Sequence, residues 1–138
     1  MSTFSQLLKQ SDIFYQFTAA QLELVSALCQ ERIFSAGELI FPENSSSTDL
    51  YIIVRGEVDV SLEIVNAAGA REACNLARLR RGQSFGEIAL VDQGLRSASA
   101  RAVEDETHLL MIPREQLLML CETYPPLGFR LMYNLAAD

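Results

Sequence analysis

The chain contains few of the residues on which metal sites and catalytic triads depend. Its 138 residues include one histidine, His108, and no tryptophan. A multi-histidine metal site cannot be built from a single histidine, and a nucleophile–histidine–carboxylate triad would have to use His108 itself. His108 follows an acidic run at residues 104–106 that is typical of a solvated turn. We therefore expect no metal site and no enzyme.

Positive charge is also scarce. Lysine and arginine together number 11 against 18 aspartates and glutamates, which gives a net charge of −7, and Lys9 is the only lysine. Nucleic acids and anionic membranes attract proteins through a positive field, which this composition does not provide. We expect this chain to contact neither directly, and an anionic ligand has to be small and held by a local site.

Further absences concern targeting and cross-linking. No apolar run approaches the roughly 20 residues that span a bilayer, and the N-terminus lacks the basic start and long apolar core of a secretory signal. The cysteines are an odd and widely spaced set, which favours reduced thiols over a disulfide framework: Cys29, Cys74 and Cys121. These features predict a cytoplasmic protein. Its length and its 49% hydrophobic content predict a single domain with a substantial core.

Both ends of the chain read as helices. Thr18 and Gln21 have capping-box spacing, and Leu22 and Val25 follow on one face of the helix that they begin. Near the other end, Pro113 suits a first helical position, and prolines 125 and 126 separate two helical segments. The pattern predicts an N-terminal helical segment over residues 1–30 and C-terminal helices over residues 113–138.

The middle of the chain, residues 31–112, reads as short strands. Residues 50–55 form a mostly apolar run that is typical of a buried strand, and residues 58–64 alternate between apolar and polar. Residues 66–69 look like a hairpin connection, and two more strands are expected at 98–102 and 109–112. Many short strands between flanking helices predict a mainly β sandwich or jelly roll.

The segment over residues 85–98 carries the most informative chemistry. Gly86 allows a tight backbone, and the four residues after it favour one helical turn, whose free N–H groups attract an anion. The fork of Arg96 matches phosphate oxygens, and Ser97 adds a hydroxyl. Glu87 would accept hydrogen bonds from a sugar hydroxyl or pair with an arginine. Taken locally, a phosphate-and-sugar site and a surface loop with an Arg–Glu pair are equally good interpretations.

The same segment resembles a known motif. Phe-Gly-Glu-Ile-Ala-Leu at residues 85–90, followed by Arg96-Ser97-Ala98, is similar to the phosphate-binding cassette of cyclic nucleotide-binding domains. These are the sensor modules of catabolite activator proteins, of the regulatory subunits of cyclic-nucleotide-dependent kinases and of gated channels. Residues 34–41 and 49–58 resemble two further segments of that family, in the right order. The resemblance implies an eight-stranded jelly roll, a cupin-like double-stranded β-helix, with helices on either side.

The resemblance also implies a role for each residue of the cassette. The residue aligned with Glu87 accepts the ribose 2′-hydroxyl, and the residue aligned with Arg96 pairs with the exocyclic phosphate oxygens. Ser97 aligns with a residue that gives a hydroxyl and a backbone N–H to the phosphate. The remaining ligand-binding positions are Gly86, Ile88, Ala89 and Ala98. The ligand implied is cyclic AMP or cyclic GMP, with no cofactor and no metal.

In this family the last helix acts as a lid, and here Arg130 is the candidate lid residue. Because the chain stops near that helix, we expect a piece of a larger protein whose output domain or partner lies elsewhere, and the apolar last helix allows a homodimer. Leu95 stands where many members carry proline. Two alternatives remain: a domain that has lost its ligand and serves protein interaction, and a metal-binding barrel enzyme, for which one histidine is too few.

Overall fold

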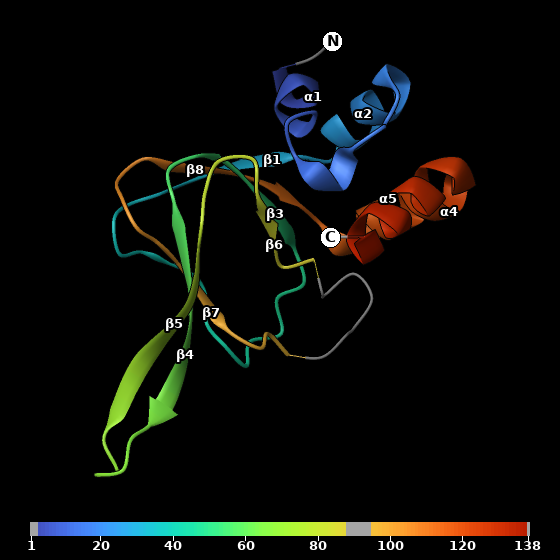
Figure 1. Ribbon diagram of the computed structural model, residues 1–138. Coiled ribbons are helices and arrows are strands. Elements are labelled where there is room, and N and C mark those ends of the chain that lie inside the picture. Colours follow the sequence, from blue (N-terminus) through green and yellow to red (C-terminus); the bar gives the residue numbers. More distant parts are fainter. Residues whose placement is uncertain (1–2, 88–94, 138) are drawn as a thin grey trace.

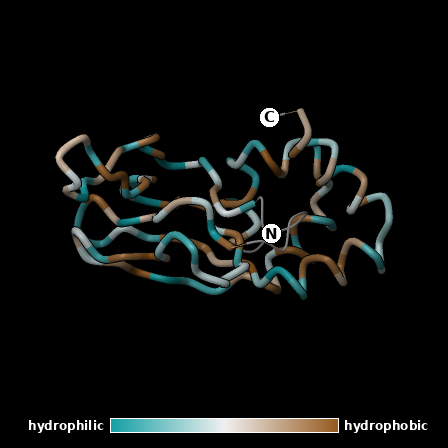
Figure 2. The backbone as a smooth tube through the Cα atoms, turned by 90° about the horizontal axis from the view of Figure 1, so that it is seen from below, coloured by the Kyte–Doolittle hydropathy of each residue, from teal (hydrophilic) through white to brown (hydrophobic). Residues whose placement is uncertain are grey.

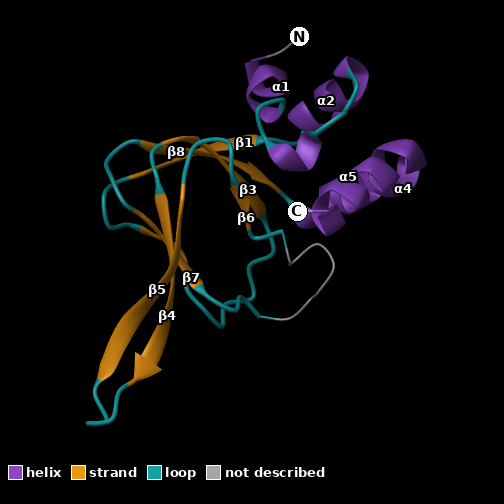
Figure 3. Ribbon diagram, viewed as in Figure 1, coloured by secondary structure: helices purple, strands orange, loops and turns teal. Residues whose placement is uncertain are grey.

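A computed structural model describes residues 3–87 and 95–137. In these ranges eight strands form two antiparallel sheets, and helices from both ends of the chain gather at one end of the sandwich (Figures 1 and 3). Figure 2 shows the same division from below, with the strands at one end and the helices at the other. The predicted jelly roll with flanking helices is confirmed.

The helical end combines the two termini. The N-terminal side contributes α1 (Thr3–Leu8), the 3₁₀ helix η1 (Asp12–Phe14) and α2 (Ala19–Ser26), and the C-terminal side contributes α4 (Arg114–Thr123) and α5 (Pro125–Ala137). The predicted capping box is present: Thr18 accepts from the Gln21 N–H, and the Gln21 side chain accepts from the Thr18 N–H. Among the described residues, no helix has the length and apolar character needed to cross a membrane.

The two sheets have four strands each. The first has the order β1-β8-β3-β6 and consists of β1 (Gln30–Phe34), β8 (Thr107–Ile112), β3 (Leu50–Arg55) and β6 (Ser84–Phe85). The second has the order β2-β7-β4-β5 and consists of β2 (Leu39–Phe41), β7 (Ser99–Ala102), β4 (Val58–Val65) and β5 (Arg71–Leu79). Strands far apart in sequence therefore become neighbours, and β2 lies beside β7.

Strand β3 is buried on both of its faces, which explains its apolar sequence. Successive side chains of a strand point to opposite faces. Leu50 and Ile52 pack into a core shared with the helices, whereas Tyr51 and Ile53 pack into a second core between the sheets. The helix-side core also includes Leu127 and other residues of the helices, so β3 and the helices share one core. The prediction of a buried strand over residues 50–55 is confirmed.

Two local expectations differ from the structure. The alternation in β4 predicted a buried Ile64, but its side chain is 42% exposed, because the outer half of the β4–β5 hairpin extends beyond the sandwich (Figure 1). Pro113 precedes the first turn of α4 as its N-cap residue, with an extended ψ of 130°, and Arg114 begins the helix. In both cases the pattern identified the element, and the packing around it set its limits.

Candidate functional site

Arg96 lies at the junction of four segments of the chain. It precedes β7, and around it are the end of β2, the loop over residues 42–49 that joins β2 to β3, and Gly86 directly after β6. Its main-chain N–H donates to the carbonyl of Ser45 at 2.8 Å, and its carbonyl accepts from the N–H of Asn44 at 2.7 Å. Two backbone hydrogen bonds therefore hold Arg96 against the β2–β3 loop, independently of the contacts of its side chain.

The guanidinium of Arg96 donates to three oxygens, two from the β2–β3 loop and one from Gly86. Nε donates to Oγ of Ser47 at 3.1 Å, and Nη1 donates to the carbonyl of Gly86, also at 3.1 Å. Nη2 donates to the carbonyl of Asp49 at 2.6 Å. These bonds hold the β2–β3 loop and the start of the cassette on the same arginine.

The aromatic ring of Phe41 covers one face of the guanidinium. The central carbon of the Arg96 guanidinium lies 4.1 Å from the ring centroid, within the range of a cation–π contact. Phe41 in turn packs against Tyr51 and Phe85 with 6.0 Å between centroids in each case. The Arg96 guanidinium therefore has an aromatic ring against one face and hydrogen-bond acceptors around its edge, and Arg96 is only 7% exposed.

The charge of Arg96 is buried without a direct carboxylate partner in the described part of the chain. The ion pairs found among residues 3–87 and 95–137 involve other basic side chains: Arg55, Arg71, Arg78, His108 and Arg114. Burial lowers the pKa of Arg96, while the nearby acidic groups of Tyr51, Asp49 and Glu87 raise it again. A buried cation whose partners are neutral oxygens is stabilised by an incoming anion.

Gly86 has a conformation and a position that exclude a side chain. Its φ is +84°, in the left-handed region that favours glycine. A Cβ at this position would lie 2.8 Å from Nη1 of Arg96 and 2.9 Å from the carbonyl oxygen of Asp49. The glycine of the cassette is therefore required both for the turn and for the close approach of the arginine.

The other predicted ligand residues lie within or on either side of residues 88–94, which are outside the described ranges. Glu87 is half-buried next to Gly86, Ser97 is exposed beside Arg96, and Ala98 is half-buried after it. Ile88 and Ala89 lie outside the described residues. The structure thus brings Gly86 and Arg96 into contact and places Glu87 within electrostatic reach of the arginine.

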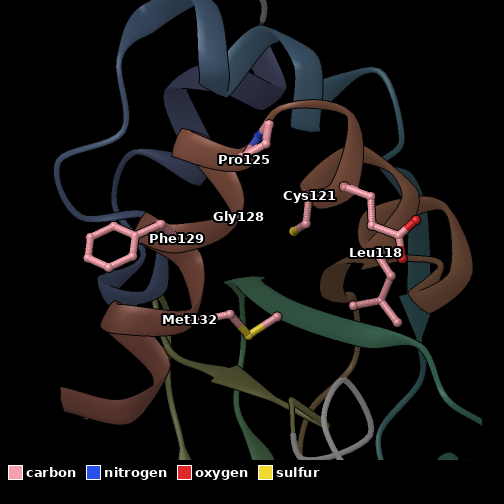
Figure 4. Close-up of a pocket in the computed structure, with 7 residues that line it drawn as sticks. Leu118, Cys121, Pro125, Gly128, Phe129 and Met132 are labelled. Atoms are coloured by element: carbon pink, nitrogen blue, oxygen red, sulfur yellow. The ribbon is translucent and has the colours of Figure 1, made fainter.

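In the described part of the chain, Arg130 contacts the aromatic ring of Tyr133, which is on the same helix, α5. Its guanidinium lies 5.2 Å from the ring centroid of Tyr133, one turn further along α5. An apolar hollow of about 450 Å³ lies between α4 and α5. Cys121 and Met132 point towards it, and the ring of Phe129 extends outward from α5 (Figure 4). The lid role of Arg130 stays a prediction.

Three residues that hold Arg96 were not among the predicted site residues. Phe41 reads in the sequence as an ordinary apolar strand residue, and Ser47 is one of three consecutive serines in a polar loop. Asp49 contributes its main-chain carbonyl, which no residue type reveals. Only the pairing of β2 with β7 brings Phe41 close to Arg96 in space, so the sequence contains no local signal for this contact.

Comparison with known proteins decides what this arrangement is. A sequence model of the family described as "Cyclic nucleotide-binding domain" matches residues 31–124, which include the sheets, the cassette and α4. The chain belongs to the cyclic nucleotide-binding domain family. The three segments that carried the resemblance, residues 34–41, 49–58 and 85–98, all lie within the matched region.

Individual relatives place the domain within longer proteins. The chain is 35% identical to the cyclic AMP receptor protein of Thermus thermophilus over 94% of its own length, and it spans 56% of that relative. The crystal structure of the Thermus thermophilus catabolite activator protein matches with a TM-score of 0.74 at 35% identity, over 92% of this chain and 55% of that one. A cyclic nucleotide-binding domain from Methylobacillus flagellatus shares the fold, with a TM-score of 0.81 at 22% identity over 97% and 72% of the two chains.

Proposed function

We propose that this domain is a non-catalytic sensor that binds a cyclic nucleotide, cyclic AMP or cyclic GMP, and passes the signal to its C-terminal helices. The observation that carries the proposal is the burial of Arg96 at the cassette, with neutral oxygens as its hydrogen-bond partners. A cyclic phosphate carries one negative charge, which one arginine neutralises. A net charge of −7 is therefore compatible with this ligand.

The neighbours of Arg96 have the chemistry that the rest of the ligand requires. Glu87 offers carboxylate oxygens to the ribose 2′-hydroxyl, and Ser97 offers a hydroxyl and a backbone N–H to the phosphate. Gly86, with the cassette positions Ile88, Ala89 and Ala98, would supply a backbone that approaches the ligand closely. The name of the relative from Thermus thermophilus, a cyclic AMP receptor protein, supports cyclic AMP as the first ligand to test.

The packing offers a direct route from the ligand to the helices. Asp49, whose carbonyl accepts from Arg96, is followed at once by β3, and Leu50 and Ile52 of β3 share a core with Leu127 of α5. A ligand that changes the hydrogen bond between Arg96 and the carbonyl of Asp49 acts on this core through β3. It favours whichever arrangement of α4 and α5 it binds more tightly. An output domain or partner protein would then read the position of these helices.

Thermal unfolding with and without nucleotide tests the proposal. At about 100 times the dissociation constant, a ligand that binds only the folded state raises the melting temperature of a domain this size by roughly 5–15 °C. We expect this rise for the wild type and for Arg71→Lys, an exposed arginine on β5. We expect Arg96→Lys, which keeps the charge and loses the fork, to show a rise of no more than about half that of the wild type at the same nucleotide concentration. An unchanged melting temperature in the wild type with both nucleotides contradicts the proposal.

Exposed aromatic side chains on α5 favour a second candidate, an interaction module without a ligand. Phe129, which lines the hollow between α4 and α5, is 66% exposed, and Tyr133, one turn further along α5, is 57% exposed. Exposed apolar patches of this kind mark protein–protein contacts. This candidate predicts no thermal shift with nucleotide and self-association that Phe129→Ser abolishes, as measured by light scattering. A dose-dependent thermal shift with either nucleotide excludes it.

A further inference from the structure

We infer that Phe41 is a positioning residue of the proposed phosphate site, because its ring fixes the plane of the Arg96 guanidinium before a ligand arrives. The contact between the two side chains is a feature of the structure. Its effect on nucleotide affinity rests on the proposed function. The two parts of the inference are therefore tested separately.

The position of Phe41 follows from the sheet. It ends β2, where it is paired with Ala100 of β7, and Arg96 lies four residues before Ala100 in the chain. The guanidinium comes to lie over the ring, with 4.1 Å between its central carbon and the ring centroid. Because both side chains are more than nine-tenths buried, water competes little for the cation, and the contact is stronger than it would be at the surface.

The ring of Phe41 is itself held by two other aromatic side chains. Its centroid lies 6.0 Å from that of Tyr51 and 6.0 Å from that of Phe85. Tyr51 and Phe85 are stacked on one another, with 5.1 Å between centroids and 11° between planes. Phe41 is therefore part of a packed aromatic group and cannot turn away from Arg96 without disturbing that group.

The ring and the hydrogen bonds constrain Arg96 in complementary ways. The oxygens of Ser47, Asp49 and Gly86 accept from the edge of the guanidinium, whereas the ring of Phe41 covers a face. An edge contact fixes the direction of each N–H, and a face contact fixes the plane. Bidentate recognition of phosphate depends on that plane. Holding it in advance reduces the side-chain entropy that is lost on binding and so raises affinity.

An aliphatic side chain at position 41 would fill much of the same space without attracting the cation. Phe41→Leu should therefore loosen the guanidinium, whereas Phe41→Tyr keeps the aromatic face and should preserve its position. A suitable control is Phe34→Leu, because Phe34 packs against the same inter-sheet core from β1. Any loss that comes from general weakening of that core affects Phe34→Leu as well.

The first experiment measures the contact in the ligand-free protein by nuclear magnetic resonance. A proton held over an aromatic face resonates upfield of its usual position, and the Nε–H signal of Arg96 is assigned as the one missing from Arg96→Lys. We expect this signal to move downfield in Phe41→Leu and to stay upfield in Phe41→Tyr and Phe34→Leu. An unmoved signal in Phe41→Leu overturns the inference, whether or not the domain binds nucleotide.

The second experiment measures the affinity for cyclic AMP and cyclic GMP. We expect Phe41→Leu to bind about 3- to 30-fold more weakly than the wild type, which is the range from an exposed to a desolvated cation–π contact. Phe41→Tyr and Phe34→Leu should stay close to the wild type. Equal losses in Phe41→Leu and Phe34→Leu, or no loss in either, overturn the positioning role. If the wild type binds neither nucleotide, the proposed function and the effect of Phe41 on affinity are both wrong, while the resonance experiment still decides the contact.

Discussion

The side-chain amide of Asn134 donates a hydrogen bond of 2.9 Å to the main-chain carbonyl of Ile13, which lies 121 residues earlier in the chain. The same nitrogen donates to the carbonyl of Tyr15 at 2.8 Å. Asn134 is on α5 and only 8% exposed, and the two carbonyls belong to η1 and the turn that follows it. The side-chain amide of Asn134 therefore joins α5 to η1 and the turn that follows it.

Asn134→Asp should destabilise the domain because it keeps the shape and removes both donors. The carbonyls of Ile13, which is buried, and of Tyr15 lose their partner, and a carboxylate is placed against them. We expect a loss of about 2–4 kcal/mol in the free energy of unfolding, measured by urea denaturation. Asn75→Asp on the exposed face of β5 introduces the same charge and should cost little. Equal losses in the two variants would show that the two hydrogen bonds of Asn134 contribute no stability.

Gly86→Ala should cost more than a comparable change elsewhere in the chain. Gly69, in the hairpin turn between β4 and β5, has nearly the same φ, +82° against +84°, but a Cβ there meets nothing within 4 Å. Gly69→Ala should lose about 1–2 kcal/mol from backbone strain alone. Gly86→Ala adds the clash with Arg96 and Asp49, and we expect it to lose more stability and to bind nucleotide more weakly. Equal unfolding free energies and wild-type affinity would contradict this account of the cassette.

Glu87→Gln should remove the preference for a ribose 2′-hydroxyl. A hydrogen bond to a charged acceptor contributes about 1.5–3 kcal/mol, so the wild type should bind cyclic AMP at least 10-fold more tightly than its 2′-deoxy analogue. In Glu87→Gln the two ligands should bind with more similar affinities. Competition binding with both ligands measures the ratio. If the ratio is the same in the wild type and in the variant, Glu87 does not contact the ribose.

Asp59 should make stability depend on acid pH. Arg78 donates to both of its carboxylate oxygens, at 2.8 and 2.9 Å, and this hydrogen bonding lowers the pKa of Asp59 from 3.8. A depressed folded-state pKa stabilises the protein above the unfolded-state value, and this contribution is lost as the pH falls through the folded-state value.

Asp59→Asn should therefore unfold at lower urea concentration than the wild type at pH 7, and the difference should shrink as the pH falls below 3.8. Glu72→Gln, on the exposed face of the neighbouring β5, removes the same charge and serves as the control. A difference that stays constant down to acid pH would show that Asp59 acts through packing rather than through its charge.

The features that the sequence predicted well are those with local causes. The capping box of Thr18 and Gln21 spans four residues, and the turn at residues 66–69 joins adjacent strands. The run of apolar residues in β3 reflects burial on two faces, which the composition of this one strand is enough to reveal. The cassette was also visible, because its glycines, its acid and its arginine lie within 12 consecutive residues, 86–97.

The features that the sequence did not predict depend on pairing between distant segments. The contact between Phe41 and Arg96 requires β2 to lie beside β7. The hydrogen bond from Asn134 to Ile13 joins segments near the two ends of the chain. The exposure of Ile64 depends on how far the hairpin extends beyond the sandwich. None of these is encoded in a short window of residues, so only the folded arrangement reveals them.

Isothermal titration of cyclic AMP and cyclic GMP into the wild type, Arg96→Lys and Arg71→Lys tests the central claim most directly. We predict saturable binding of one nucleotide per chain for the wild type and for Arg71→Lys. Arg96→Lys should bind about 10- to 100-fold more weakly, because it loses the bidentate contact with the phosphate while keeping the charge. An absence of binding heat with the wild type at several temperatures, or equal affinity in all three proteins, would contradict the account.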